Sequence, residues 1–145
     1  MINSKSKYPS LLVCNDHEEV GSVSSSGAQG PFLRSVFERI IRNQTDTSDA
    51  VERAVRKSSF WSIDNAHGIH PNYKDKHDNN HSPQLNAGPV IKINANQRYA
   101  SNSNSIALFK SICNQGKIPY QSFVMRSDMA CGSTIGPMTS AGLGI

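Results

Sequence analysis

The sequence has no apolar run long enough to cross a membrane. None of its 145 residues belongs to a hydrophobic stretch of the roughly 20 residues that a spanning helix needs. Residues 1–16 also lack the apolar segment and small-residue cleavage site of a secretory signal. We therefore expect an intracellular protein without membrane partners. The length suits one ordinary domain.

Cysteine is scarce, and no sign of charge dominates. The three cysteines (Cys14, Cys113 and Cys131) are an odd number without CxxC spacing, which disfavours a disulfide framework and a thiolate zinc site. Lys and Arg number 15 against 11 Asp and Glu, so the excess of positive charge is mild. Aromatic residues make up only 7% of the chain. A nucleic-acid binder is therefore the least favoured of the function classes that we considered.

Short apolar runs bounded by turn residues alternate with amphipathic segments. The runs predict four strands, at residues 11–14, 60–63, 89–93 and 122–125. Apolar residues spaced three and four apart predict helices from Pro31 onward, after caps at 47–49, and over 102–116. We expect a disordered tail at 1–9 and loops at 65–88 and 131–137. Strands that alternate with helices indicate the α/β class.

Polar side chains follow the predicted strands, where open α/β sheets bind ligands. Glu18 and Glu19 come after the first strand, and Asp64 ends the second. A hydrolytic metal site needs one carboxylate to hold the metal and another to take a proton from water. Adjacent glutamates can divide those roles. The ordinary alternatives are a solvated acidic pair, an aspartate that caps a turn, and a surface lysine at Lys92.

Four histidines lie within fifteen residues, at His67, His70, His77 and His81. HxxH and HxxxH spacings can each ligate zinc. A non-catalytic metal-binding or interaction module that uses this His67–His81 cluster is therefore an alternative function. Loop histidines that bond only to the backbone explain the same residues equally well.

Four runs of sequence occur in an order that resembles successive motifs of the aspartyl aminopeptidases: VCNDHEEVGS, SIDNAHGIHPNY, GPVIKINANQRYA and MRSDMACGSTIGP. The resemblance covers the chain from about Leu11 onward. It implies a partial three-layer α/β/α sandwich of the zinc-dependent exopeptidase type, with a mixed sheet and flanking helices, and an incomplete catalytic domain over 10–145. It also implies a zinc metallo-aminopeptidase that uses a pair of zinc ions and removes N-terminal Asp or Glu from peptides.

The resemblance also implies roles for individual residues. Glu18 matches the general base, Glu19 a ligand of one zinc, and Asp64 a ligand of the other. The positions that match substrate contacts are Glu18, Asp64, His67, Lys92 and Tyr99. Lys92 is the natural partner of an acidic substrate side chain, because a desolvated ammonium pairs with a carboxylate. We expect the three carboxyl groups of Glu18, Glu19 and Asp64 to converge around the metal pair.

Other positions of the family site have no counterpart in the sequence. They are an upstream histidine ligand, a bridging aspartate, a downstream histidine ligand and a histidine that acts across a subunit boundary. The chain thus resembles an internal part of a longer protein, and we expect it to bind zinc weakly and hydrolyse little alone. We also expect self-association, since a sheet cut at both edges exposes unpaired backbone groups. The family implies a homo-oligomer in the cytoplasm, with the vacuole as an alternative.

Overall fold

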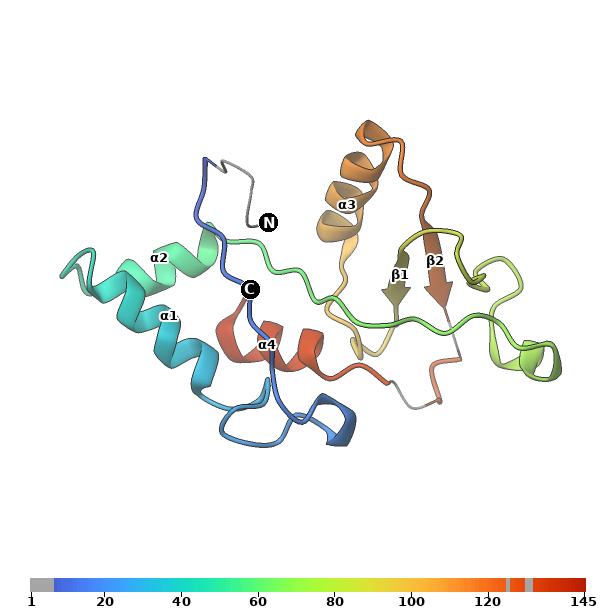
Figure 1. The fold of residues 1–145 in the computed structure, drawn as a ribbon, viewed down its shortest axis with the longest axis horizontal. Coiled ribbons are helices and arrows are strands. Elements are labelled where there is room, and N and C mark those ends of the chain that lie inside the picture. The colour runs from blue at the N-terminus through green and yellow to red at the C-terminus, as the bar shows by residue number, and fades with distance from the viewer. Residues whose placement is uncertain (1–6, 125, 130–131) are drawn as a thin grey trace.

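A computed structural model of the protein describes residues 7–124, 126–129 and 132–145. Its elements in chain order are a 3-10 helix at Glu18–Val20, α1 at Phe32–Arg42, α2 at Ala50–Arg56, a 3-10 helix at Pro71–Lys76, β1 at Val90–Ile93, α3 at Ser103–Gln115, β2 at Gln121–Val124 and α4 at Ile135–Leu143. Figure 1 shows β1, β2 and α3 on one side and α1, α2 and α4 on the other. The predicted α/β class is confirmed.

The sheet consists of β1 and β2, which run parallel and are joined through α3. Lys92 of β1 pairs in register with Phe123 of β2, so both side chains lie on the same face of the sheet. Ile91 lies on the other face and is buried, as is Cys113 of α3. The sheet therefore separates a small apolar core from the face that carries Lys92.

α3 begins where Asn102 closes a capping box. The Asn102 side chain accepts hydrogen bonds from the Asn104 and Ser105 N–H groups, and the Ser105 hydroxyl accepts one from the Asn102 N–H. These contacts satisfy backbone donors that a helix start otherwise leaves open. The helix ends at Gly116, as the sequence predicts, and Lys117 then turns the chain with a φ of 52°.

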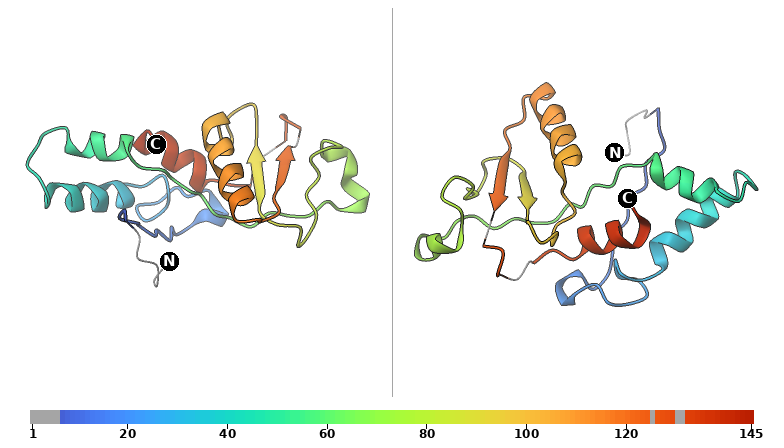
Figure 2. Two further views of the ribbon diagram at one scale, coloured as in Figure 1. Left: turned by 90° about the horizontal axis from the view of Figure 1, so that it is seen from above. Right: turned by 180° about the vertical axis from the view of Figure 1, so that it is seen from behind.

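α1 and α2 pack against each other and form the second half of the fold, as Figure 2 shows from two further sides. α2 buries Ala50, Val51 and Val55. α1 buries no residue fully, although its apolar residues recur at helical spacing, and Phe32 and Ile40 remain about half exposed. Both helices were predicted, but the apolar face of α1 is covered only in part.

Two predicted strands are wrong. Residues 11–14 and 60–63 are extended chain outside any sheet. An apolar run indicates a demand for burial, but a strand also needs a neighbour for its hydrogen bonds, and among the described residues neither run has one. Leu12 stays 74% exposed and Ile63 88% exposed.

The loop predicted over 131–137 ends early, because α4 begins at Ile135. Pro137 fits its first turn, where the missing N–H has no helical partner. Cys131, and Met125 at the end of the last predicted strand, lie outside the described residues. The loop at 65–88 is interrupted only by the 3-10 helix at Pro71–Lys76.

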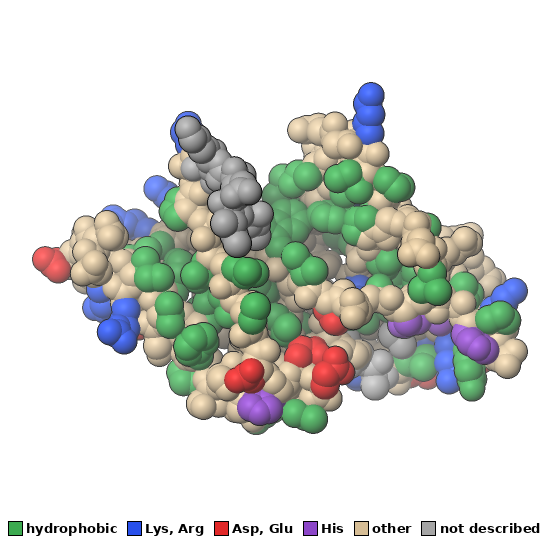
Figure 3. Space-filling view, in the orientation of Figure 1, with side chains coloured by type: hydrophobic (Ala, Val, Ile, Leu, Met, Phe, Trp, Pro, Cys, Tyr) green, Lys and Arg blue, Asp and Glu red, His purple; other side chains and the backbone are tan. Residues whose placement is uncertain are grey.

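The molecule exposes an unusually large surface. Its accessible area is 10,652 Å², whereas a compact monomer of this mass exposes about 7,300 Å². Figure 3 shows apolar side chains gathered over α3 and over the α1 region. Within the described ranges, no helix is both long enough and apolar enough to span a bilayer.

Candidate functional site

A small cavity lies on the face of the sheet that carries Lys92. Its volume is about 140 Å³, and it is lined by Asp64, Asn65, Ala66, His67, Lys92, Tyr99, Phe123 and Gly132. The extended segment after α2, both strands and the loop before α4 all contribute to it. The structure thus brings four of the predicted site residues to one cavity, namely Asp64, His67, Lys92 and Tyr99. Glu18 and Glu19 are not part of its lining.

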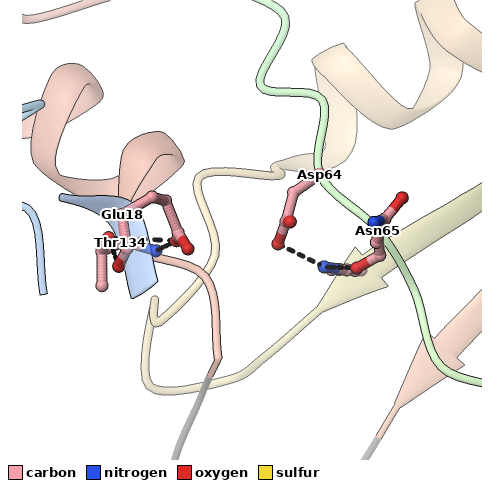
Figure 4. A network of polar contacts seen from close by, with 5 residues as sticks. Glu18, Asp64, Asn65 and Thr134 are labelled. Carbon is pink, nitrogen blue, oxygen red and sulfur yellow. Dashed lines mark hydrogen bonds and ion pairs between the residues drawn. The ribbon is translucent and has the colours of Figure 1, made fainter. Parts of the chain in front are cut away.

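The Lys92 ammonium supplies a positive charge to the cavity. Its Nζ donates to Asp64 Oδ2 at 3.0 Å and to the Asn65 carbonyl at 2.9 Å (Figure 4). The Lys92 and Asp64 side chains are 19% and 26% exposed, so water screens the pair only in part. Nζ also lies 5.9 Å from the centre of the Tyr99 ring. An ammonium has three N–H groups, and these two hydrogen bonds leave one for a ligand.

His67 contributes a neutral ring to the same cavity. Partial burial lowers the pKa of His67, and the neighbouring His77 and Lys92 lower it further. The lowered pKa favours the neutral imidazole. Its edge packs against the Phe123 ring at a centroid distance of 5.2 Å. Between His67 and Lys92, which both line the cavity, Lys92 is the side chain that carries positive charge.

Glu18 belongs to a second set of hydrogen bonds, which it makes with Thr134 in the loop before α4. Gly132 of the same loop lines the cavity. Its Oε1 accepts from the Thr134 N–H at 2.9 Å and from the Thr134 hydroxyl at 3.1 Å (Figure 4). The Thr134 hydroxyl also bonds to Ser22 Oγ at 2.6 Å, and Ser22 is fully buried. The short loop that holds Glu18 thus also supplies Gly132 to the cavity wall.

A tight turn presents Glu18 to this loop. The His17 carbonyl accepts from the N–H groups of Val20 and Ser22, and Gly21 between them has a φ of 101°. A residue with a Cβ adopts that φ only under strain. The turn therefore explains why a glycine follows the Glu-Glu pair.

The described residues do not form a metal centre by themselves. Residues 7–124, 126–129 and 132–145 contain no group of three or more His, Cys, Asp or Glu placed to hold a metal ion. Glu18 and Asp64 belong to separate sets of hydrogen bonds (Figure 4). The convergence of Glu18, Glu19 and Asp64 around a metal pair stays a prediction.

Two of the four clustered histidines bond to each other, and the other two bond to different residues. His67 bonds to His77, His81 bonds to Asp78, and His70 accepts from the Asn72 N–H. The bond from His81 lowers the pKa of Asp78. Among the described residues, no third His, Cys, Asp or Glu is placed with the His67–His77 pair to hold a metal ion, so the geometry gives no support to the alternative metal-binding module.

The sequence analysis missed two groups that act on Glu18. Thr134 falls in the loop predicted over 131–137, Ser22 lies outside every predicted element, and neither was given a role. Their sequence context carries no signal beyond nearby glycines, Gly21 directly before Ser22 and Gly132 two residues before Thr134. The contact from Glu18 to Thr134 spans 116 residues, so no local pattern could have indicated it.

Fold and site together define an α/β protein whose polar side chains gather on one face of a parallel sheet. Comparison with known proteins identifies its family. Residues 2–145 match the model of the aminopeptidase I zinc metalloprotease (M18) family. The probable M18 family aminopeptidases 2 of Ectopseudomonas mendocina and Pseudomonas aeruginosa are 55% and 54% identical over all 145 residues. The chain belongs to the M18 family. It spans about a third of the length of these relatives, 33% of each.

Solved structures agree with this assignment. In the complex of Ape4 and Nbr1, one chain is 46% identical with a TM-score of 0.82, and the match covers 89% of our chain and 24% of that chain. The crystal structure of prApe1 is 28% identical with a TM-score of 0.81, covering 90% and 27%. The mApe1 dodecamer of S. cerevisiae is 28% identical with a TM-score of 0.74, covering 90% and 28%.

Proposed function

We propose that the chain carries part of the active site of a zinc aminopeptidase that removes N-terminal Asp or Glu from peptides. The observation that carries this proposal is the cavity that Asp64, His67, Lys92 and Tyr99 share. The relatives named as aminopeptidases support the reaction class. The preference for acidic residues rests on the charge that Lys92 brings to the cavity.

Lys92 would recognise the side-chain carboxylate of the substrate. The ammonium is largely shielded from water, so a carboxylate that meets its third N–H gains a charge-assisted hydrogen bond. A neutral isostere such as Asn would offer that N–H only a neutral acceptor, and the hydrogen bond would be weaker. His67 and Tyr99 would form the walls beside it.

Glu18 would act as the general base. Both described hydrogen bonds to its carboxylate end on Oε1, which leaves Oε2 to take a proton from water and return it to the leaving amine. Thr134 would hold the carboxylate in one orientation during the transfer. The step requires a water molecule between Glu18 and the scissile carbonyl.

Zinc is the metal by which the family is described, and Glu19 and Asp64 would be the ligands that this chain contributes. Carboxylate oxygens are suitable zinc ligands. However, no group of three or more His, Cys, Asp or Glu in the described part of the chain is placed to hold a metal ion, so these residues do not fit a complete site. The pair of zinc ions per site is part of the proposal.

The proposal extends to assembly and location. The dodecamer of mApe1 supports a homo-oligomer, since that protein shares the fold over nearly all of our chain. Residence in the cytoplasm rests on the resemblance to the aspartyl aminopeptidases.

The test compares binding of a peptide with N-terminal Asp and the same peptide with N-terminal Asn to the purified chain, by calorimetry. We expect the Asp peptide to bind about tenfold or more tightly, which corresponds to about 1.4 kcal/mol from the charged pair. Lys92→Met should abolish the difference. Lys110→Met, on α3 beside Tyr120, is the control that should preserve it.

Equal affinity for both peptides, or a preference that survives Lys92→Met, contradicts acidic specificity. Zinc-dependent release of Asp provides the second measurement. Any release should be lost in Glu18→Gln, and release that persists in that variant contradicts the role of the base.

A further inference from the structure

His67 and His77 share a hydrogen bond between like atoms. Their Nε2 atoms lie 3.0 Å apart. Two imidazole nitrogens at that distance need one hydrogen between them, because two lone pairs repel and two N–H groups clash. One ring is therefore the donor and the other the acceptor.

The backbone decides which ring donates. His77 Nδ1 lies 3.3 Å from the Tyr73 carbonyl oxygen, which can only accept. A neutral His77 therefore carries its proton on Nδ1 and has a lone pair on Nε2. The shared hydrogen then belongs to His67 Nε2, and His67 Nδ1 is the nitrogen with the lone pair.

Packing holds both rings in this arrangement. His67 and His77 each lie edge-on to the Phe123 ring, at centroid distances of 5.2 and 5.8 Å, and Phe123 is 2% exposed. The His77 N–H bonds to the Lys74 carbonyl at the end of the 3-10 helix, which fixes the backbone beside Tyr73. Neither ring can turn without breaking contacts.

We propose that His77 is a positioning residue that fixes the tautomer of His67, with the proton on Nε2 and an acceptor at Nδ1. His77 does not line the cavity, and His67 does. The consequence for substrate rests on the proposed function. A neutral His67 in this form accepts a hydrogen bond from a substrate N–H, and the carboxylate is left to Lys92.

The tautomer can be measured on the chain itself, whether or not it binds peptide. In ¹⁵N-histidine-labelled protein, at a pH where the imidazoles are neutral, we expect His67 Nε2 to have the shift of a protonated nitrogen and Nδ1 that of a bare one. A ¹⁵N–¹⁵N coupling across the hydrogen bond should join the two Nε2 atoms. A proton on His67 Nδ1, or no coupling in the unsubstituted chain, overturns the proposal.

Two ring-preserving variants separate positioning from packing. His77→Phe keeps an edge against Phe123 but has no acceptor, so the His67 shifts should move toward a mixture of tautomers. His81→Phe removes a neighbouring histidine that bonds to Asp78 and not to His67, and the His67 shifts should not change. Unchanged His67 shifts in His77→Phe also overturn the proposal.

Peptide binding provides an independent readout. His77→Phe should weaken binding of the Asp peptide about 3- to 10-fold, the effect of one neutral hydrogen bond, and should affect the Asn peptide equally. If no peptide binds the unsubstituted chain while the coupling is present and the His67 shifts are as expected, the proposed function fails and the tautomer assignment is confirmed.

Discussion

Removing the Thr134 hydroxyl should destabilise the fold through a buried chain of hydrogen bonds. Glu18 Oε1 is only an acceptor, and the threonine hydroxyl has one hydrogen. When that hydrogen goes to Glu18, the Ser22 hydroxyl must donate to Thr134. Thr134→Val preserves the shape of the side chain and removes the hydroxyl's hydrogen bonds to Glu18 and Ser22.

The magnitude follows from burial. Ser22 is fully buried, so its hydroxyl loses a partner that water cannot replace, at a cost of about 1–3 kcal/mol. The lost bond to the partly exposed Glu18 adds about 0.5–1 kcal/mol. We expect Thr134→Val to lower the free energy of unfolding by about 1.5–4 kcal/mol in total. Thr134→Ser keeps the hydroxyl and is the matched control, with an expected loss below about 1 kcal/mol.

A double-mutant cycle isolates the buried hydroxyl. Ser22→Ala alone should cost about 1 kcal/mol, because Thr134 can still donate to Glu18. In the double variant no hydroxyl is left unpaired. Its loss in the free energy of unfolding should therefore be about 1–2 kcal/mol smaller than the sum of the losses in the two single variants. Ser22 has a φ of 63°, and any strain there is common to the single and double variants and cancels.

Urea unfolding followed by circular dichroism gives the four free energies. If the two substitutions add within about 0.5 kcal/mol, the chain from Ser22 through Thr134 to Glu18 does not act as a unit. If Thr134→Ser is as damaging as Thr134→Val, the loss lies in packing and the hydrogen-bond argument is refuted.

Two further predictions concern charge and surface. The ¹H NMR titration midpoint of His67 should fall below its ordinary value of 6.5. His67 then has no effect on the free energy of unfolding above pH 6.5, and it lowers that free energy as the pH falls below 6.5. Lys92→Met should raise the midpoint, and a midpoint at or above 6.5 in the unsubstituted chain contradicts the structure. In sedimentation experiments, the purified chain should self-associate as its concentration rises, because its accessible area exceeds that of a compact monomer by about 3,300 Å². A chain that stays monomeric at every concentration and melts sharply and reversibly would refute this prediction.

Local patterns predicted the elements that depend on local interactions. The helices from Pro31, after the 47–49 caps, and over 102–116 all form, and so do β1 and most of β2. Spacing of apolar residues and capping side chains determine such elements within a few residues of chain. The parallel βαβ unit of β1, α3 and β2 was likewise within reach of local patterns, because short connections join its elements.

The failures concern contacts with distant parts of the chain. The runs at 11–14 and 60–63 have the composition of buried strands and lack partner strands in the described structure. The bonds from Glu18 to Thr134 and from His67 to His77 join side chains that the sequence analysis treated separately. The family resemblance supplied roles for Glu18, Lys92 and Tyr99, but it could not indicate which neighbours orient them.

The exposed area and the failed strands have a common physical reason. A leucine or isoleucine that is almost wholly in water, as Leu12 and Ile63 are, forgoes about 1.5–3 kcal/mol that burial would provide. The same applies to the half-covered face of α1, where Phe32 and Ile40 are exposed. The excess area of about 3,300 Å² lies within the range that obligate interfaces bury. The sequence pattern at these positions is therefore that of an interface, and the runs at 11–14 and 60–63 are where we expect a partner strand to pair.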